Sequence, residues 1–204
     1  MINPEFLLTS LIVVLVPGTG VLYTISTGLA QRWRASIVAA IGCTLGILPH
    51  LTASILGLSA ILHMSARVFQ VLKIMGALYL LYLAWGMWRD KGMLKIEQDE
   101  QKQNAMKIVL KGILINILNP KLTLFFFAFL PLFVAPDVSS PSQQMLGLGA
   151  IFMLLTLLIF VLYGILASGV SSYLLNSPKS IRRVQKSFAL VFAFLAVRLA
   201  ISKR

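Results

Sequence analysis

A single lysine, Lys121, lies in the middle of an apolar run from Ile108 to Val134. It follows Asn119 and Pro120, and proline interrupts a helix because it lacks an N–H and clashes with the preceding turn. If the helix begins near Gly112, Lys121 lies about 14 Å along it, near the middle of a hydrocarbon core about 30 Å thick. Irregular backbone at that depth must line a cavity or pack in protein. The lysine therefore predicts a pathway or binding site, unless its ammonium reaches back to the interface.

A second interruption lies about eleven residues into the first apolar stretch, at Pro17-Gly18-Thr19-Gly20. Unwinding there would free backbone groups, and the helix that begins near Thr19 would present its positive end to a carboxylate. A simple packing kink is the alternative. The matched break before Lys121 favours a site, so we predict that substrate is bound by residues of both breaks: Pro17, Gly18, Thr19, Gly20, Asn119, Pro120 and Lys121.

Gly42, Gly46 and His50 are spaced by four and share one face of a predicted helix. The two glycines predict close helix packing, within the chain or between subunits. The imidazole of His50 could carry protons or contact substrate, or it could be a neutral ring bonded to a backbone carbonyl. Tyr79 and Asn116 are further predicted substrate contacts, and each is a polar residue in an apolar stretch.

The composition is that of an integral membrane protein. Of 204 residues, 58% are hydrophobic and 12% are charged, which excludes an ordinary soluble domain. The net charge of +12 does not indicate a nucleic-acid partner, because the basic residues lie in short loops between apolar stretches. The single cysteine and the lack of clustered metal ligands predict no cofactor and no metal. An intramembrane enzyme using His50 and Lys121 is an alternative, but no nucleophile stands out, so we predict no enzymatic activity.

The hydrophobic pattern predicts an all-α membrane protein with six transmembrane helices, over about 6–27, 36–62, 68–88, 108–134, 144–176 and 186–202. We treat residues 1–204 as one transporter domain, with repeat one over about 1–88, a polar cytoplasmic linker over about 89–107 and repeat two over about 108–204. Three helices in each half require inverted repeats, with helices one and four broken. Most basic residues follow helices one, three and five, so the positive-inside rule places both termini outside the cytoplasm.

The order of these motifs resembles the lysine exporter / homoserine-threonine exporter (LysE/RhtB) family. The resemblance rests on Pro17-Gly18, Gly42-xxx-Gly46-xxx-His50, the run from Leu72 to Leu80, and the stretch from Gly112 to Lys121. It implies a multi-pass transporter of the bacterial inner membrane that exports amino acids, coupled to protons. Thr19-Gly20 after the break is similar to the homoserine/threonine branch, and Ile47 stands where many members carry an acidic residue.

We therefore expect a secondary transporter that exports small neutral amino acids or derivatives, of the homoserine, homoserine lactone or threonine type. Lys121 would be the counter-ion of the substrate carboxylate. Because burial disfavours the charged form of an amine, Lys121 is also a candidate proton carrier, with His50 as its competitor. The expected partners are the substrate, protons and lipid, and a homo-oligomer stays open. Export of another small metabolite and a non-transporting membrane scaffold are the alternatives.

Overall fold

The computed structural model describes residues 4–16, 18–62, 104–135 and 139–169, with single positions between 71 and 89 and between 186 and 197. The regular elements in these ranges are all helical. Pro17 and Tyr79, two of the predicted substrate contacts, lie outside the described residues.

The first apolar stretch forms two helices with a break between them. α1 (Pro4–Leu15) ends one residue before Val16, and α2 (Thr19–Leu45) begins directly after Gly18, which has extended backbone angles. The interruption is therefore shorter than the predicted one, because Thr19 and Gly20 already belong to the helix. Glycine at this position leaves room for the side chain of Lys121, as described below.

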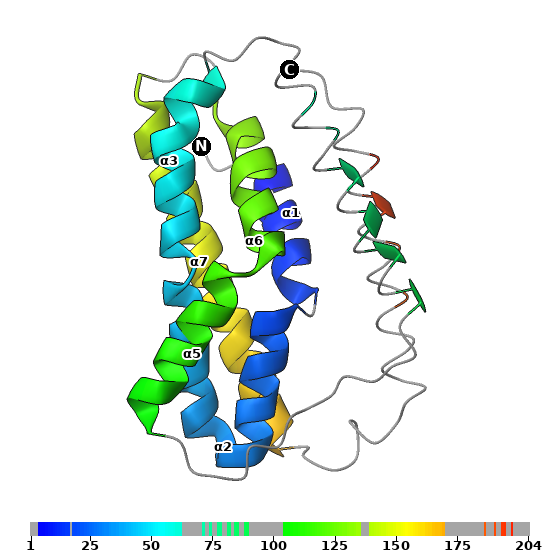
Figure 1. The fold of residues 1–204 in the computed structure, drawn as a ribbon, viewed down its shortest axis with the longest axis vertical. Helices are drawn as coiled ribbons and strands as arrows, with labels where there is room; N and C mark the ends of the chain where they lie inside the picture. Colours follow the sequence, from blue (N-terminus) through cyan, green and yellow to red (C-terminus); the bar gives the residue numbers. More distant parts are fainter. Residues whose placement is uncertain are drawn as a thin grey trace. The chain divides into compact units, whose positions relative to one another are not determined.

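α2 is a helical hairpin rather than one rod. Its chain reverses at Arg32, where φ is 71° and ψ is 177°, and the two arms then run side by side (Figure 1). The Ser36 hydroxyl, on the second arm, donates to the carbonyl of Thr24 on the first at 3.0 Å. A further turn at Gly46 and Ile47 separates α2 from α3 (Leu48–Leu62), just before Pro49, whose ring is expected to kink the chain there.

The predicted break at Asn119-Pro120 is present. It separates α5 (Ala105–Ile117) from α6 (Pro120–Leu124), and the two sides are bent by 51°. Pro120 can begin a helix but cannot continue one, and the Asn119 side chain accepts from the Lys121 backbone N–H at 3.0 Å, which is an N-cap. The chain continues as a π-helix, η1 (Phe125–Phe129), and a 3₁₀ helix, η2 (Leu130–Phe133).

α7 (Pro141–Gly169) is a long apolar helix that packs along α2. Its Phe152 ring stacks on Phe125 of η1 with centroids 4.2 Å apart. By length and composition, Thr19–Gly57 and Pro141–Ser168 can cross a membrane, and the bent pair Ala105–Ile117 and Pro120–Phe133 would make a third span. The described part of the chain is therefore that of an all-helical membrane protein.

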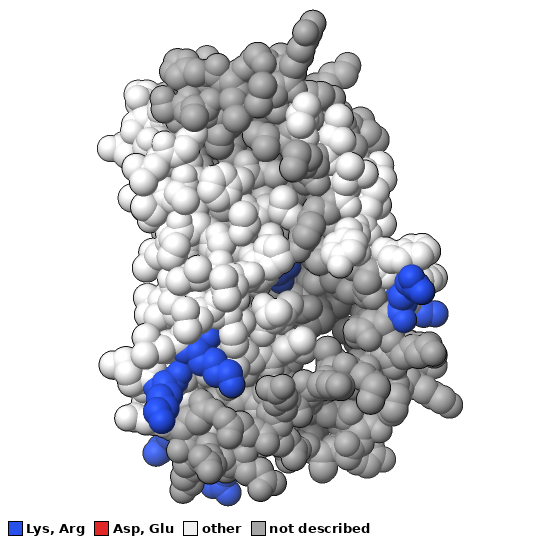
Figure 2. Space-filling model, viewed as in Figure 1, with Lys and Arg blue, Asp and Glu red and all other residues white. Residues whose placement is uncertain are grey.

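The chain divides into two compact units. One comprises residues 1–55 and 95–171 and contains both breaks. Most of the described basic side chains of this unit gather near the end where α5 begins and α2 reverses, and most of the described surface above them is uncharged (Figure 2). The other unit comprises 56–94 and 172–204. Its described positions between 71 and 89 and between 186 and 197 are helical. Within it, the Lys186 ammonium lies 5.1 Å from the Trp88 ring centroid. The six-helix inverted repeat stays a prediction.

Glycines bring α2 and α5 together in the first unit. A β-carbon at Gly42 would lie 2.5 Å from the Val109 carbonyl oxygen, and one at Gly46 would lie 2.7 Å from the Ile113 carbonyl oxygen. From the other side, a β-carbon at Gly112 would lie 3.0 Å from the backbone nitrogen of Cys43. Both backbones thus approach to a distance that no other residue permits. This contact holds the end of α5, and with it the second break, against α2.

We predict that Gly42→Ala destabilises the protein by about 1–3 kcal/mol, because the new methyl group meets backbone that cannot turn aside. The matched control is Gly147→Ala on α7, where an added β-carbon finds no atom within 4 Å and helix propensity favours alanine by about 0.5–1 kcal/mol. Thermal unfolding in detergent or nanodiscs measures both. Equal unfolding temperatures for the two variants would contradict the packing argument.

Candidate functional site

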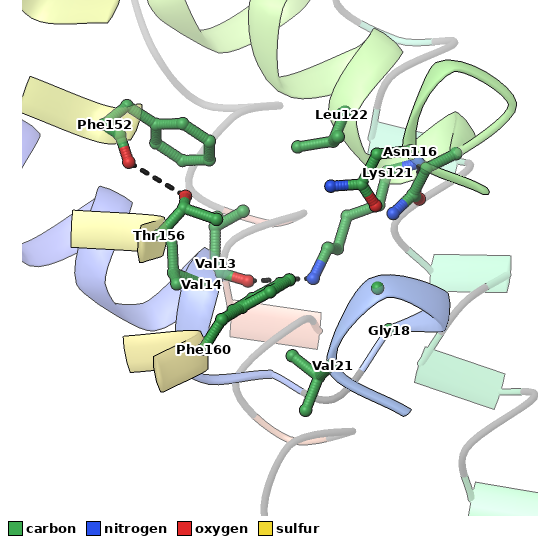
Figure 3. Close-up of a pocket in the computed structure, with 12 residues that line it drawn as sticks. Val13, Val14, Gly18, Val21, Asn116, Lys121, Leu122, Phe152, Thr156 and Phe160 are labelled. Atoms are coloured by element: carbon green, nitrogen blue, oxygen red, sulfur yellow. Dashed lines mark hydrogen bonds between the residues drawn. The ribbon is translucent and has the colours of Figure 1, made fainter. Parts of the chain in front are cut away.

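The Lys121 ammonium binds the carboxyl-terminal end of α1. Its Nζ donates to the carbonyl oxygens of Val13 and Val16, each at 3.0 Å. The side chain crosses the gap between the two breaks to reach them (Figure 3). The last carbonyls of a helix have no partner within it and carry partial negative charge. The lysine therefore satisfies the end of one broken helix from the start of another.

Tyr163 of α7 completes this cap. Its hydroxyl donates to the carbonyl of Leu15 at 2.9 Å. A carbonyl without a hydrogen-bond donor would be costly in an apolar bundle, where no water replaces the missing donor. The end of α1 is thus held by one cationic and one neutral donor, which come from different helices.

Asn116, in the last turn of α5, contributes an acceptor with no partner. Its amide nitrogen donates to the Cys43 carbonyl at 2.7 Å, and this bond fixes which way the amide points. Among the described residues, the side-chain oxygen has no hydrogen-bond partner, although Asn116 is only 1% exposed. A β-carbon at Gly20 would lie 2.6 Å from this oxygen, so only glycine can pack this closely beside it. A buried acceptor without a donor is unusual and is a mark of a functional site.

These groups surround one small cavity between the breaks (Figure 3). About 10 Å³ is open to the centre of a water-sized molecule, which is room for roughly one water molecule. The cavity is thus closed to a substrate of amino-acid size. Its walls come from α1, the start of α2, the second break and α7: Val13, Val14, Gly18, Gly20, Val21, Asn116, Asn119, Lys121, Leu122, Phe152, Thr156 and Phe160.

Five of the predicted substrate contacts line this cavity: Gly18, Gly20, Asn116, Asn119 and Lys121. Thr19 and Pro120 are exposed and are not among its lining residues. Gly42 and Gly46 contact α5, as described above. The structure therefore brings together residues from both breaks, which are about 100 residues apart in the sequence.

His50 lies behind the second break and not among the residues that line the cavity. Its Nε2 is 3.0 Å from the Asn116 carbonyl oxygen, and its Nδ1 is 3.4 Å from the Thr123 hydroxyl. The ring also stacks on Phe126, with centroids 6.4 Å apart. The imidazole is thus hydrogen-bonded to the backbone of Asn116, and Asn116 lines the cavity.

Comparison with known proteins identifies the family. The model of the LysE type translocator family matches residues 11–203 of this chain. The chain belongs to the LysE type translocator family.

Several full-length relatives share the family. An "Uncharacterized membrane protein" of Vibrio cholerae is 31% identical over 97% of this chain and 96% of its own length. The homoserine/homoserine lactone efflux protein of Salmonella typhimurium is 27% identical over 96% of this chain and 94% of its own. The leucine efflux protein of Klebsiella pneumoniae is 23% identical, over 96% and 92%. No solved structure matches the chain.

Some parts of the site in this LysE type translocator were not predicted. Phe152, Thr156 and Phe160 line the cavity from α7, and their spacing of four could have indicated a shared face. The carbonyls of Val13 and Val16 carry no signal in the sequence, because every residue has a carbonyl and only the break exposes these two.

We predict that Lys121→Met destabilises this LysE type translocator by about 2 kcal/mol or more, because each carbonyl left without a donor costs about 1–3 kcal/mol. Methionine keeps most of the volume of the side chain and removes the ammonium. Lys107→Met on the exposed face of α5 is the matched control and should change stability by less than about 0.5 kcal/mol. Thermal unfolding compares the two, and an unchanged unfolding temperature for Lys121→Met would refute the capping role.

Proposed function

We propose that this protein is a secondary transporter that exports small neutral amino acids or close derivatives. The observation that carries the proposal is the small cavity at the two breaks, which is lined by Lys121 with its ammonium and by Asn116, whose amide oxygen has no partner among the described residues. A zwitterion needs both a cation and acceptors, and here they adjoin helix ends of opposite polarity. The names of two relatives, efflux proteins for homoserine or its lactone and for leucine, support the same class of substrate.

The carboxylate of the substrate would bind between the start of α2 and Lys121. The first N–H groups of a helix have no partner inside it, and Gly18 and Gly20 place those of α2 at the cavity wall. A β-carbon at Gly18 would lie 3.1 Å from the Lys121 Nζ, so backbone and ammonium are close enough to share one anion.

Neutral side chains are favoured because the cavity offers nothing to a second positive charge. Among the described residues that line it, none is Asp or Glu, and the only charged group is the Lys121 ammonium itself. A basic amino acid would bring an additional cation next to that ammonium. Val13, Val21, Leu122 and Phe160 instead suit a short apolar or hydroxylated side chain.

Transport requires the cavity to open, because its volume of about 10 Å³ has room for only about one water molecule. We propose that six transmembrane helices in two inverted repeats move about this site, in the inner membrane of a bacterium and with both termini outside the cytoplasm. The two breaks would then lie near the middle of the membrane, where such transporters bind substrate. A homo-oligomer is compatible with this arrangement and is not required by it.

Proton coupling has two candidate carriers, Lys121 and His50. The hydrogen bonds around His50 suit both of its protonation states. When neutral, its Nδ1 can accept from the Thr123 hydroxyl; when protonated, it can donate to that hydroxyl, which can turn toward the Asn119 carbonyl 3.5 Å away. Such a relay would connect the proton to the break at which substrate binds.

A membrane scaffold is the second candidate function. It is favoured by one observation, that the Lys121 ammonium is already satisfied by backbone carbonyls. A scaffold would keep this cap permanently and would never open the cavity. Transport measurements separate the two functions.

We predict counterflow of labelled homoserine, threonine or leucine in proteoliposomes containing the wild-type protein. Lys121→Ala and Lys121→Arg should each reduce this counterflow by at least about tenfold, because alanine lacks the charge and arginine spreads it over a larger fork. Lys111→Ala should transport as the wild type does. Wild-type flux in both Lys121 variants would eliminate the counter-ion role, and no flux with any of the three amino acids would favour the scaffold or another substrate.

We predict that His50→Gln separates exchange from proton coupling. Glutamine can still donate to the Asn116 carbonyl but does not titrate, so amino-acid exchange should continue while an imposed pH gradient no longer drives net efflux. The comparison is net efflux with and without the gradient, in the variant and in the wild type. If the variant responds to the gradient as the wild type does, Lys121 becomes the remaining candidate carrier.

A further inference from the structure

We propose that the end of α1 and Asn116 form a subsite for the ammonium group of the substrate. Lys121 occupies this subsite only while no substrate is bound. The inference rests on the proposed function, since it concerns how the same cavity binds its ligand. It adds a second role for Lys121, as a stand-in for the group that the substrate brings.

The Lys121 ammonium binds carbonyl oxygens that would suit the ammonium of a substrate equally well. Nζ donates to Val13 and Val16 at 3.0 Å each, so two carbonyl oxygens already hold a primary ammonium in the arrangement that the α-ammonium of an amino acid would need. The partial negative charge at the end of α1 favours any cation there. The two groups are the same in chemistry and differ only in what they are attached to.

The side-chain oxygen of Asn116 is an acceptor that Lys121 does not use. A primary ammonium has three N–H donors, and the two carbonyls take two of those of Lys121. Asn116 lines the same cavity, and its buried Oδ1 has no hydrogen-bond partner among the described residues. A ligand ammonium that is not tied to residue 121 can satisfy the carbonyls and turn a third donor to this oxygen. The unpartnered oxygen is thus explained as a contact that forms only when substrate is bound.

Exchange of the two ammonium groups would link loading to the movement of Lys121. When the substrate ammonium takes the carbonyls, Lys121 is released and can pair with the substrate carboxylate beside Gly18. When the substrate leaves, Lys121 returns and the carbonyls are never left without a donor. The transporter can then close around the small cavity.

The test replaces the tethered ammonium with a free one. Purified Lys121→Ala in nanodiscs is titrated with n-butylammonium, with n-butanol, which has no charge, and with n-butyltrimethylammonium, which has charge but no N–H. Only n-butylammonium should raise the unfolding temperature. In the Lys121→Ala and Asn116→Ala double variant, about tenfold more amine should be needed, the equivalent of one lost hydrogen bond. Equal effects of the three compounds, or no change on removing Asn116, would overturn the subsite.

The wild type gives a second measurement if Lys121→Ala does not fold. Carbamylation by cyanate is followed by mass spectrometry at Lys121 and at the exposed Lys111, so that reagent lost to the added amine cancels in the ratio. Displacement by n-butylammonium should raise the Lys121 to Lys111 ratio several-fold, and n-butanol should not; an unchanged ratio refutes displacement. Neither measurement depends on flux, so amine binding without amino-acid transport would reject the proposed substrates and keep the subsite.

Discussion

The carbonyl oxygens at the end of α1 must find donors inside an apolar bundle, and the arrangement of the first unit follows from this need. A helix that stops at a membrane surface gives its last carbonyls to water, but one that stops within the protein cannot. Lys121 and Tyr163 supply the donors from segments more than 100 residues away in sequence. Because an unpaired carbonyl in such surroundings costs more than a hydrogen bond gains, the break in α1 and the lysine after Pro120 depend on each other.

Close helix packing positions the remaining groups. Backbone contact of α2 with α5 at Gly42 and Gly46 lets the Asn116 side chain reach the Cys43 carbonyl, and this bond fixes the orientation of its amide. His50 holds the carbonyl of the same residue from behind. Asn116 is thus fixed by its backbone and by one end of its amide, which leaves a single oxygen unpaired. The glycine spacing along α2 thus determines how α5 presents the polar Asn116 side chain.

Much of this arrangement could be predicted from residue types, and the rest could not. Pro120 and Lys121 predict a break with a charge because proline and lysine are both costly in a membrane helix. The pairing of Lys121 with α1 could not be predicted, because its acceptors are backbone atoms of two valines. The turn at Gly46 and Ile47 lies just before Pro49, which cannot donate to the Leu45 carbonyl. Proline indicates that the helix is interrupted, but the close packing of Gly46 against α5 could not be predicted. Tertiary contact, which a hydropathy pattern does not contain, decides such features.

The identity of the capping residue bears on mechanism as well as stability. An arginine would present a planar fork of five donors, and a bound metal ion would stay in place. A lysine instead offers one compact primary ammonium on a flexible stem, the same group that an amino acid carries on its α-carbon. Helix ends of opposite sign at one break attract the two ends of a zwitterion. In the proposed cycle, Lys121 therefore holds the negative end of α1 until the ligand arrives and then turns to the ligand carboxylate, so that a single side chain would serve both states of the cavity.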